Sequence, residues 1–124
     1  EVDQEVYFAD FNWSVLMKKL PKKDVSYTEL SKFPAVRRDL ALLLDVNVPF
    51  ADVERVARSC EKKLLRKVEL FDVYEGEHLP AGKKSYAVAF TLSDESKTMN
   101  DKQTEAIMGK IIKQLQQQLG AELR

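Results

Sequence analysis

The fold of this chain is decided by a segment that begins at residue 36. It reads Val36-Arg37-Arg38-Asp39-Leu40-Ala41-Leu42-Leu43-Leu44-Asp45. Because successive side chains of a strand point to opposite faces, the alternate leucines at positions 40, 42 and 44 predict a β-strand with one apolar face. After residue 49, apolar residues recur at helical spacing between charged ones, as Val53, Val56, Ala57, Cys60 and Leu64. This spacing predicts an amphipathic helix after the strand.

The rest of the chain predicts two further strands, a second helix and a last short strand. Residues 66–75 and 86–92 have strand patterns, and the loop at residues 76–82 contains glycine and proline, which favours a hairpin. Asn100 is a suitable N-cap with Gln103 as its capping-box partner, and Gly120 is suited to end the helix. Residues 121–124 are long enough to pair as a final strand.

This order of elements predicts an α+β fold of the ferredoxin-like βαββαβ type. Its four-stranded antiparallel sheet would carry two helices on one face, since two helices with one apolar stripe each cover only one face. The domain is expected over residues 25–124. Residues 1–24 are expected to be a short N-terminal extension from a preceding domain, with a strand at residues 6–11 and a helix at residues 13–20.

Composition excludes several classes of protein. The chain has 124 residues, of which 44% are hydrophobic and 32% charged, so it is neither a disordered nor a membrane sequence. No apolar run approaches the roughly 20 residues of a membrane span, and the start lacks the features of a signal peptide, which predicts a cytoplasmic protein. The initial Glu1 suggests an excised piece of a longer chain.

The reactive side chains are few. A single cysteine, Cys60, and a single histidine, His78, provide neither a disulfide nor a zinc site. Cys60 lies on the apolar stripe of its helix, and His78 lies in the hairpin loop, where we expect solvent exposure. No serine or cysteine has a histidine and an acid nearby in sequence, so we expect no catalytic centre, metal or cofactor in this chain.

Alternation assigns the strand residues to two faces. The apolar face should meet the helices and carries Leu40, Leu42, Leu44, Phe71, Val73, Tyr86, Val88, Phe90 and Leu92. By elimination, the open face should carry Asp39, Ala41, Leu43, Leu70, Asp72, Tyr74, Ser85, Ala87 and Ala89. This second set combines small residues with an acid, a hydroxyl group and one aromatic ring.

Such a face has the chemistry to receive a splayed-out RNA base. Single-stranded RNA is recognised by stacking on aromatic side chains and by hydrogen bonds to base edges. Tyr74 would be the platform, Asp72 an acceptor and Ser85 a donor or acceptor. A plainer interpretation stays open, in which Tyr74 packs on its alanine neighbours and Asp72 and Ser85 are solvated. Twenty basic residues balance twenty acidic ones, so any recognition of RNA must be local rather than a coating of phosphates.

Four strings of residues, in this order and spacing, resemble one known family. They are residues 33–41 (Phe33-Pro34-Ala35-Val36-Arg37-Arg38-Asp39-Leu40-Ala41), 70–76 (Leu70-Phe71-Asp72-Val73-Tyr74-Glu75-Gly76), 82–85 (Gly82-Lys83-Lys84-Ser85) and 119–124 (Leu119-Gly120-Ala121-Glu122-Leu123-Arg124). The resemblance is to the ferredoxin-fold anticodon-binding domain at the carboxyl end of bacterial phenylalanyl-tRNA synthetase beta chains. It covers about residues 27–124.

The resemblance implies a function and site residues. The domain would hold the anticodon stem-loop of phenylalanine tRNA, with the remainder of the beta chain and the synthetase alpha chain as partners. Tyr74 would stack on an anticodon base, Asp72 and Ser85 would read base edges, Ala41 would line the pocket and Arg124 would reach the loop. ATP and magnesium would serve the parent enzyme, outside this chain.

Basic residues and other functions complete these expectations. Alternation places Arg37 on the open side, and the clusters at Lys62–Lys67 and Lys83–Lys84 are candidates for phosphate contacts at the mouth of the open face or for a merely solvated surface. Two other functions stay open, a small-molecule effector-binding domain and a protein-interaction module. The first predicts a closed polar pocket and the second a wide apolar patch.

Overall fold

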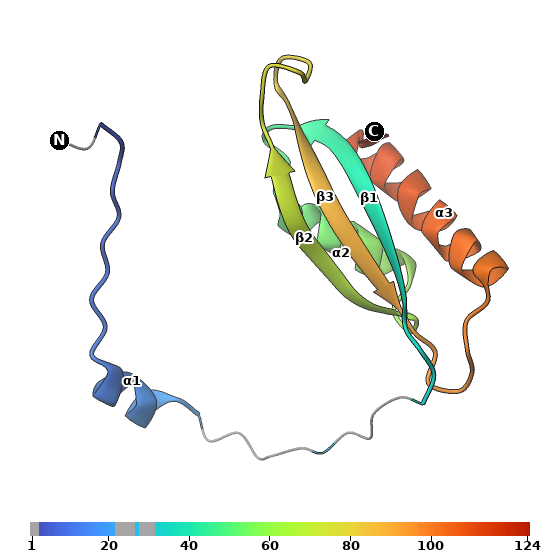
Figure 1. The fold of residues 1–124 in the computed structure, drawn as a ribbon, viewed down its shortest axis with the longest axis horizontal. Coiled ribbons are helices and arrows are strands. Elements are labelled where there is room, and N and C mark those ends of the chain that lie inside the picture. Colours follow the sequence, from blue (N-terminus) through green and yellow to red (C-terminus); the bar gives the residue numbers. More distant parts are fainter. Residues whose placement is uncertain (1–2, 22–26, 28–31) are drawn as a thin grey trace. The chain divides into compact units, whose positions relative to one another are not determined.

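A computed structural model describes residues 3–21, 27 and 32–124 of the chain (Figure 1). The chain separates into two compact units, residues 1–30 and residues 31–124. The boundary expected between residues 24 and 25 lies outside the described residues.

The described residues of the first unit contain one helix, α1 (Trp13–Lys19), as the sequence predicts. It begins where the side chain of Asn12 accepts a hydrogen bond of 3.1 Å from the backbone N–H of Val15. Residues 6–11 were expected to form a strand, and this prediction is wrong. A strand needs a neighbour for its backbone N–H and C=O groups, and none of the strands described in the structure pairs with this segment.

The second unit has the predicted order of elements. They are β1 (Val36–Asp45), α2 (Phe50–Cys60), β2 (Leu65–Tyr74), β3 (Lys83–Leu92), α3 (Asp101–Leu119) and β4 (Glu122–Leu123). The sheet has the order β2-β3-β1-β4, and each neighbouring pair is antiparallel. The ferredoxin-like α+β fold is therefore confirmed.

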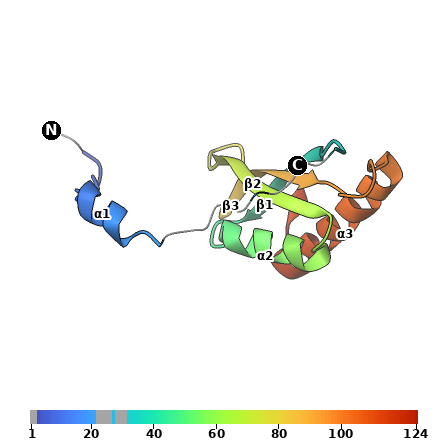
Figure 2. The ribbon, with the colours of Figure 1, turned by 90° about the horizontal axis from the view of Figure 1, so that it is seen from below.

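Both helices of this unit cover the same face of the sheet (Figure 2). The alternate residues Leu42 and Leu44 of β1 and Val88 and Phe90 of β3 are fully buried there. They pack in one cluster with apolar residues of α2 and α3, namely Val53, Val56, Ala57, Ile107, Met108, Ile111 and Leu115. The opposite face of the sheet carries no helix of this unit.

Helix α3 has the N-cap residue and the terminating glycine that the sequence predicts. The Oδ1 atom of Asn100 accepts a hydrogen bond of 2.8 Å from the backbone N–H of Gln103. Gly120 ends α3 in the left-handed conformation, with φ at 61°, and its N–H bonds back to the last helical turn. This turn directs the chain into β4, where Leu123 pairs with Leu42. The final residue is thereby brought to the sheet.

Replacing Gly120 by alanine is expected to destabilise the fold by about 1–2 kcal/mol, because a Cβ atom is unfavourable in the left-handed region. A Cβ atom there meets no other atom within 4 Å, so the cost comes from the backbone alone. Gly109 provides a matched control, since it lies inside α3 and also has open space around it. Gly109→Ala should stabilise the protein by about 1 kcal/mol. Urea denaturation of both variants tests the pair, and equal effects of the two would contradict it.

A β-bulge in β2 alters the expected faces. The pairing of β2 with β3 shifts between Leu70 and Asp72, so Phe71 is the extra residue. Leu70 consequently packs against the core, whereas the alternation assigned it to the open face. Phe71 was expected in the core and is instead 54% exposed. Both assignments were wrong for one reason, because alternation assumes a strand without an inserted residue.

Candidate nucleic-acid interface

The uncovered face of the sheet brings together most of the predicted site residues. Tyr74 of β2 pairs with Ser85 of β3. In the next row, Asp72 and Ala41 each pair with Ala87 from either side. Arg124 is joined to this row, because its backbone N–H donates a hydrogen bond of 3.0 Å to the carbonyl of Ala41. Five predicted residues, Ala41, Asp72, Tyr74, Ser85 and Arg124, thus occupy two adjacent rows.

The side chains of Arg124 and Tyr74 meet across this face. Arg124 starts next to β1, at one edge of the sheet, and Tyr74 belongs to β2, at the other edge. The Cζ atom of Arg124 nevertheless lies 5.8 Å from the centroid of the Tyr74 ring. This distance is within the range of a cation–π interaction. The two side chains therefore span the sheet above its small residues.

Small side chains form the floor beneath this pair. Ala41 and Ala87 are half-buried, and Ser85 is buried. Among the described residues, the Ser85 hydroxyl makes no hydrogen bond to another group, so its donor and its acceptor remain available. Asp72 is exposed beside them. The floor thus offers a flat surface with one hydroxyl and one carboxylate at hand.

The orientation of Tyr74 depends on the glycine two residues later. A Cβ atom built at Gly76 would lie 2.6 Å from the hydroxyl oxygen of Tyr74 and 2.7 Å from its Cζ atom. These distances are shorter than Cβ atoms tolerate, so the ring lies directly against the backbone of Gly76. In the sequence, Gly76 stands out only as part of a motif and has no predicted role. Its role becomes visible only in the folded chain, since a close approach of this kind leaves no pattern in the sequence.

Arg37 and Lys83 lie at opposite ends of the same face. Lys83 pairs with Asp45, one row beyond Ser85. The pKa of Asp45 lies below its usual range, chiefly because the backbone N–H of Asn47 donates to the carboxylate, with Lys83 and Lys84 adding attraction. Arg37 lies two rows beyond Ala41 and pairs with Thr91. Lys83 therefore borders the rows of Tyr74 and Asp72, and Arg37 does not.

Arg37 makes its own contacts at the far end. Its Nε atom donates a hydrogen bond of 2.8 Å to Asp39, and this carboxylate raises the pKa of Arg37. Its Cζ atom lies 5.4 Å from the ring centroid of Phe71. Phe71 was not predicted on this face, and the bulge that places it there has no obvious sequence signal.

The other basic clusters do not meet at the mouth of the open face. Lys84 pairs with Leu44 on the helix side, is buried, and lies 4.6 Å from the Tyr86 ring centroid. Lys62 and Lys63 precede β2, at the end of the sheet opposite the hairpin that holds Lys83. Of these clusters, only Lys83 borders the predicted site.

Acidic and basic side chains nearly balance on the open face. The pairing register places five acids and four bases there in the described strands and at the described C-terminus: Asp39, Asp45, Glu69, Asp72, Glu122, Arg37, Lys67, Lys83 and Arg124. Such a surface does not attract a polyanion by charge alone. It favours recognition through a few directed contacts.

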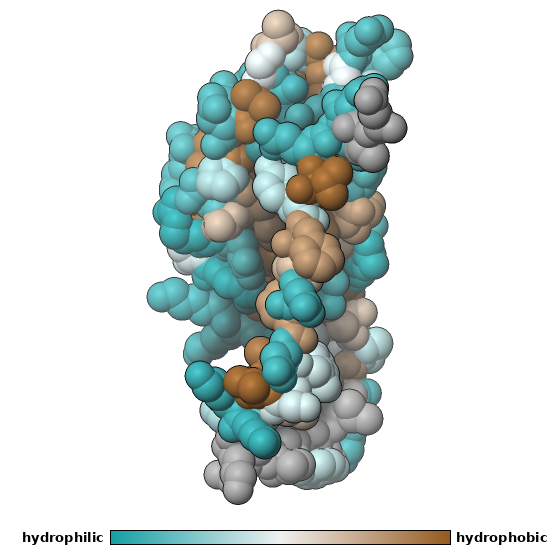
Figure 3. Space-filling model, turned by 90° about the vertical axis from the view of Figure 1, so that its left-hand side faces the viewer, coloured by the Kyte–Doolittle hydropathy of each residue, from teal (hydrophilic) through white to brown (hydrophobic). Residues whose placement is uncertain are grey.

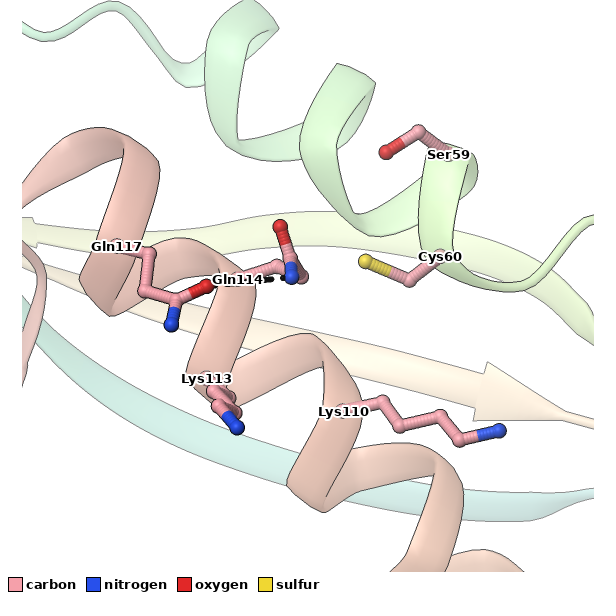
Figure 4. Close-up of a pocket in the computed structure, with 6 residues that line it drawn as sticks. All are labelled: Ser59, Cys60, Lys110, Lys113, Gln114 and Gln117. Atoms are coloured by element: carbon pink, nitrogen blue, oxygen red, sulfur yellow. Dashed lines mark hydrogen bonds between the residues drawn. The ribbon is translucent and has the colours of Figure 1, made fainter.

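A hollow of about 460 Å³ lies between α2 and α3, on the helix side of the sheet (Figure 4). It is lined by Ser59, Cys60, Lys110, Lys113, Gln114 and Gln117. The Cys60 thiol already donates to the carbonyl of Val56, and Gln114 donates to Gln117 at 3.3 Å. These polar groups are engaged within their own helices. They do not form the closed polar pocket that an effector-binding domain requires.

Exposed apolar side chains occur in both units of the chain. Figure 3 shows one side of the chain, where apolar residues lie among hydrophilic ones. In the first unit they include Tyr7, Phe8, Phe11 and Trp13, each more than half exposed. Large exposed apolar residues of the second unit are Val46, Phe71, Val73, Tyr74 and Leu123. In the described part of the chain, no helix is long and apolar enough to cross a membrane. Nor do the described residues include a group of three or more side chains suited to hold a metal ion.

Comparison with known proteins agrees with the observed fold. The profile of the family described as "Ferredoxin-fold anticodon binding domain" matches residues 31–124. The chain is 61% identical over its full length to the phenylalanine–tRNA ligase beta subunit of Bacteroides fragilis. Identity to the same subunit is 60% in Porphyromonas gingivalis and 40% in Clostridium acetobutylicum, again over the full chain.

The chain spans about 15% of the length of the curated relatives it matches. The family profile covers the unit that carries the open face, and the identities to the relatives extend over both units. The chain therefore belongs to the family of ferredoxin-fold anticodon-binding domains and is homologous over its whole length to phenylalanine–tRNA ligase beta subunits.

Proposed function

We propose that this chain recognises the anticodon stem-loop of phenylalanine tRNA through the open face of its sheet. The observation that carries the proposal is the pair of Tyr74 and Arg124, which lie 5.8 Å apart over a floor of small residues. An aromatic ring, a guanidinium group and free base-edge partners on one sheet face are the elements by which proteins bind splayed RNA bases.

Each residue of the site has a distinct task in this proposal. The Tyr74 ring stacks on one anticodon base, and the guanidinium of Arg124 is placed to cover the same base or to reach an adjoining phosphate. The carboxylate of Asp72 accepts a hydrogen bond from a base amino or imino group. The Ser85 hydroxyl donates to, or accepts from, the base edge, and Ala41 leaves room for the base.

Lys83 and Arg37 would position the RNA rather than read it. Contacts to phosphate fix the register of a nucleic acid without carrying sequence information. Lys83 borders the rows of the site and is the better placed of the two. Arg37 is already paired with Asp39, so a phosphate has to compete with that carboxylate.

The parent protein would supply everything else in aminoacylation. We propose that the chain is the carboxyl-terminal part of a cytoplasmic phenylalanine–tRNA ligase beta subunit, with residues 25–124 as the binding domain and residues 1–24 as the end of a preceding domain. The remainder of that subunit and the alpha subunit are its protein partners. ATP and magnesium act in the parent enzyme, and the described residues of this chain contain no cluster of carboxylates suited to the metal.

The test is a comparison of RNA loops with the unaltered chain. Fluorescence anisotropy would measure its affinity for the anticodon stem-loop of phenylalanine tRNA, for the same stem with a changed anticodon, and for a loop lacking one anticodon base. We expect at least fivefold weaker binding to both altered loops, since reading one base correctly is worth about 1–3 kcal/mol.

A salt titration completes this experiment. Phosphate contacts make the affinity for every loop fall as the salt concentration rises. Base contacts keep the affinities for the three loops different from one another at every salt concentration. Equal affinities for all three loops, with one common salt dependence, would leave only phosphate attraction and would overturn the proposal.

A further inference from the structure

The β-bulge in β2 places a second aromatic ring on the open face. Phe71 and Tyr74 are three positions apart in the sequence, so strict alternation would put their side chains on opposite faces. The extra residue between Leu70 and Asp72 removes this constraint. Phe71 is consequently 54% exposed, although a phenylalanine is among the residues that proteins most often bury.

The surroundings of Phe71 repeat those of Tyr74. Each ring belongs to β2, at the edge of the sheet, and each meets an arginine that reaches it from beyond β3. The Cζ atom of Arg37 lies 5.4 Å from the Phe71 ring centroid, and that of Arg124 lies 5.8 Å from the Tyr74 centroid. The hydrogen bond from Arg37 to Asp39 holds the first guanidinium in place.

Resting on the proposed function, we propose that Phe71, backed by Arg37, is a second stacking platform that takes another base of the same single-stranded loop. A strand rises about 3.3 Å per residue, and the bulge shortens the span, so Phe71 and Tyr74 start roughly 7–10 Å apart along β2. Stacked neighbours in a duplex strand are only about 3.4 Å apart. The two platforms therefore suit bases that are splayed away from each other, as in recognised RNA loops.

The two platforms differ in selectivity. Tyr74 has Ser85 and Asp72 beside it, and these groups are able to read the edge of a base. Phe71 has no hydroxyl group, and the arginine over its ring is held in an ion pair with Asp39. Stacking alone tolerates any base, because every base has a π face. The Phe71 platform thus adds affinity and holds the loop open without selecting a sequence.

The test combines a substitution in the protein with deletion of bases in the RNA. Affinity for the anticodon stem-loop is measured for the unaltered chain, Phe71→Ala, Phe71→Trp and the control Val73→Ala. Val73 lies on the same strand, is 46% exposed and pairs with Tyr86 of the helix-side face. We expect Phe71→Ala to bind at least about fivefold more weakly, whereas Phe71→Trp and Val73→Ala bind like the unaltered chain.

Loops that lack one base identify the partner of Phe71. One base of the loop, different from the base that stacks on Tyr74, should be the partner of Phe71. When that base is removed from the RNA, Phe71→Ala and the unaltered chain should bind the loop with equal affinity. If Phe71→Ala weakens every loop alike, Phe71 acts through the shape of the strand and the inference is wrong.

Tyr74→Ala separates this inference from the proposed function. If Tyr74→Ala weakens binding and abolishes discrimination while Phe71→Ala does neither, only the second platform is refuted. If neither substitution changes binding, the open face is not the RNA site and both proposals fail.

Discussion

Replacing Phe90 by alanine is expected to lower the free energy of unfolding by about 3–5 kcal/mol, which is a large part of the stability of a small domain. Phe90 lies on β3, between β1 and β2, and its side chain is fully buried beneath the helices. Phe90 pairs with Arg38 of β1 on one side and with Val68 of β2 on the other. This pairing holds the strands in place when the ring is removed, so a cavity remains beneath the helices. The midpoint and slope of urea denaturation measure the effect.

Phe71→Ala is the matched control for this substitution. The same side chain is removed from the adjacent strand, but at a position that is 54% exposed. The expected change in unfolding free energy is within about 0.5 kcal/mol. A loss at Phe71 as large as the loss at Phe90 would place Phe71 in the core, as alternation predicts, and would contradict the bulge.

The bulge marks the limit of what alternation predicts. Alternation correctly assigned Leu42, Val88 and Phe90 to the core face, because β1 and β3 pair without interruption over their full lengths. In β2 one residue without an opposite partner reversed the assignments of Leu70 and Phe71. An inserted residue shifts the alternation by one position, but Leu70 and Phe71 are both apolar, so the sequence fits either phase and the pairing of strands decides between them.

The residues of the candidate site were likewise predictable only in part. Alternation alone placed Ala41, Asp72, Tyr74 and Ser85 on one face, and the register agrees. Family resemblance supplied Arg124, because a two-residue strand at the end of the chain has too little pattern to orient a side chain. The contact between Tyr74 and the backbone of Gly76 was not predicted at all. Patterns of residue type assign faces, whereas contacts between particular atoms need the folded chain.

The second large effect is expected from Tyr74→Ala. Loss of one aromatic platform should weaken binding of the matching anticodon stem-loop by roughly 5- to 150-fold, the range that stacking on one side chain supports. Preference over the changed loop should disappear as well, because an unstacked base is no longer held against Asp72 and Ser85. Anisotropy titrations with both loops measure these changes. Tyr74→Phe, which keeps the ring, should retain most of the affinity.

Gly76→Ala displaces the Tyr74 ring without removing it. It therefore tests whether RNA binding depends on the position of the ring. The new methyl group would lie 2.6 Å from the Tyr74 hydroxyl, so the ring has to move while the strand pairing of Tyr74 with Ser85 is kept. Since Tyr74 is exposed and its hydroxyl is the far end of a side chain, the stability of the fold should change little. RNA binding should nevertheless fall as in Tyr74→Ala, and the double variant should be no weaker than either single one. Full affinity in Gly76→Ala would mean that the placement of the ring observed here is not the one that RNA uses.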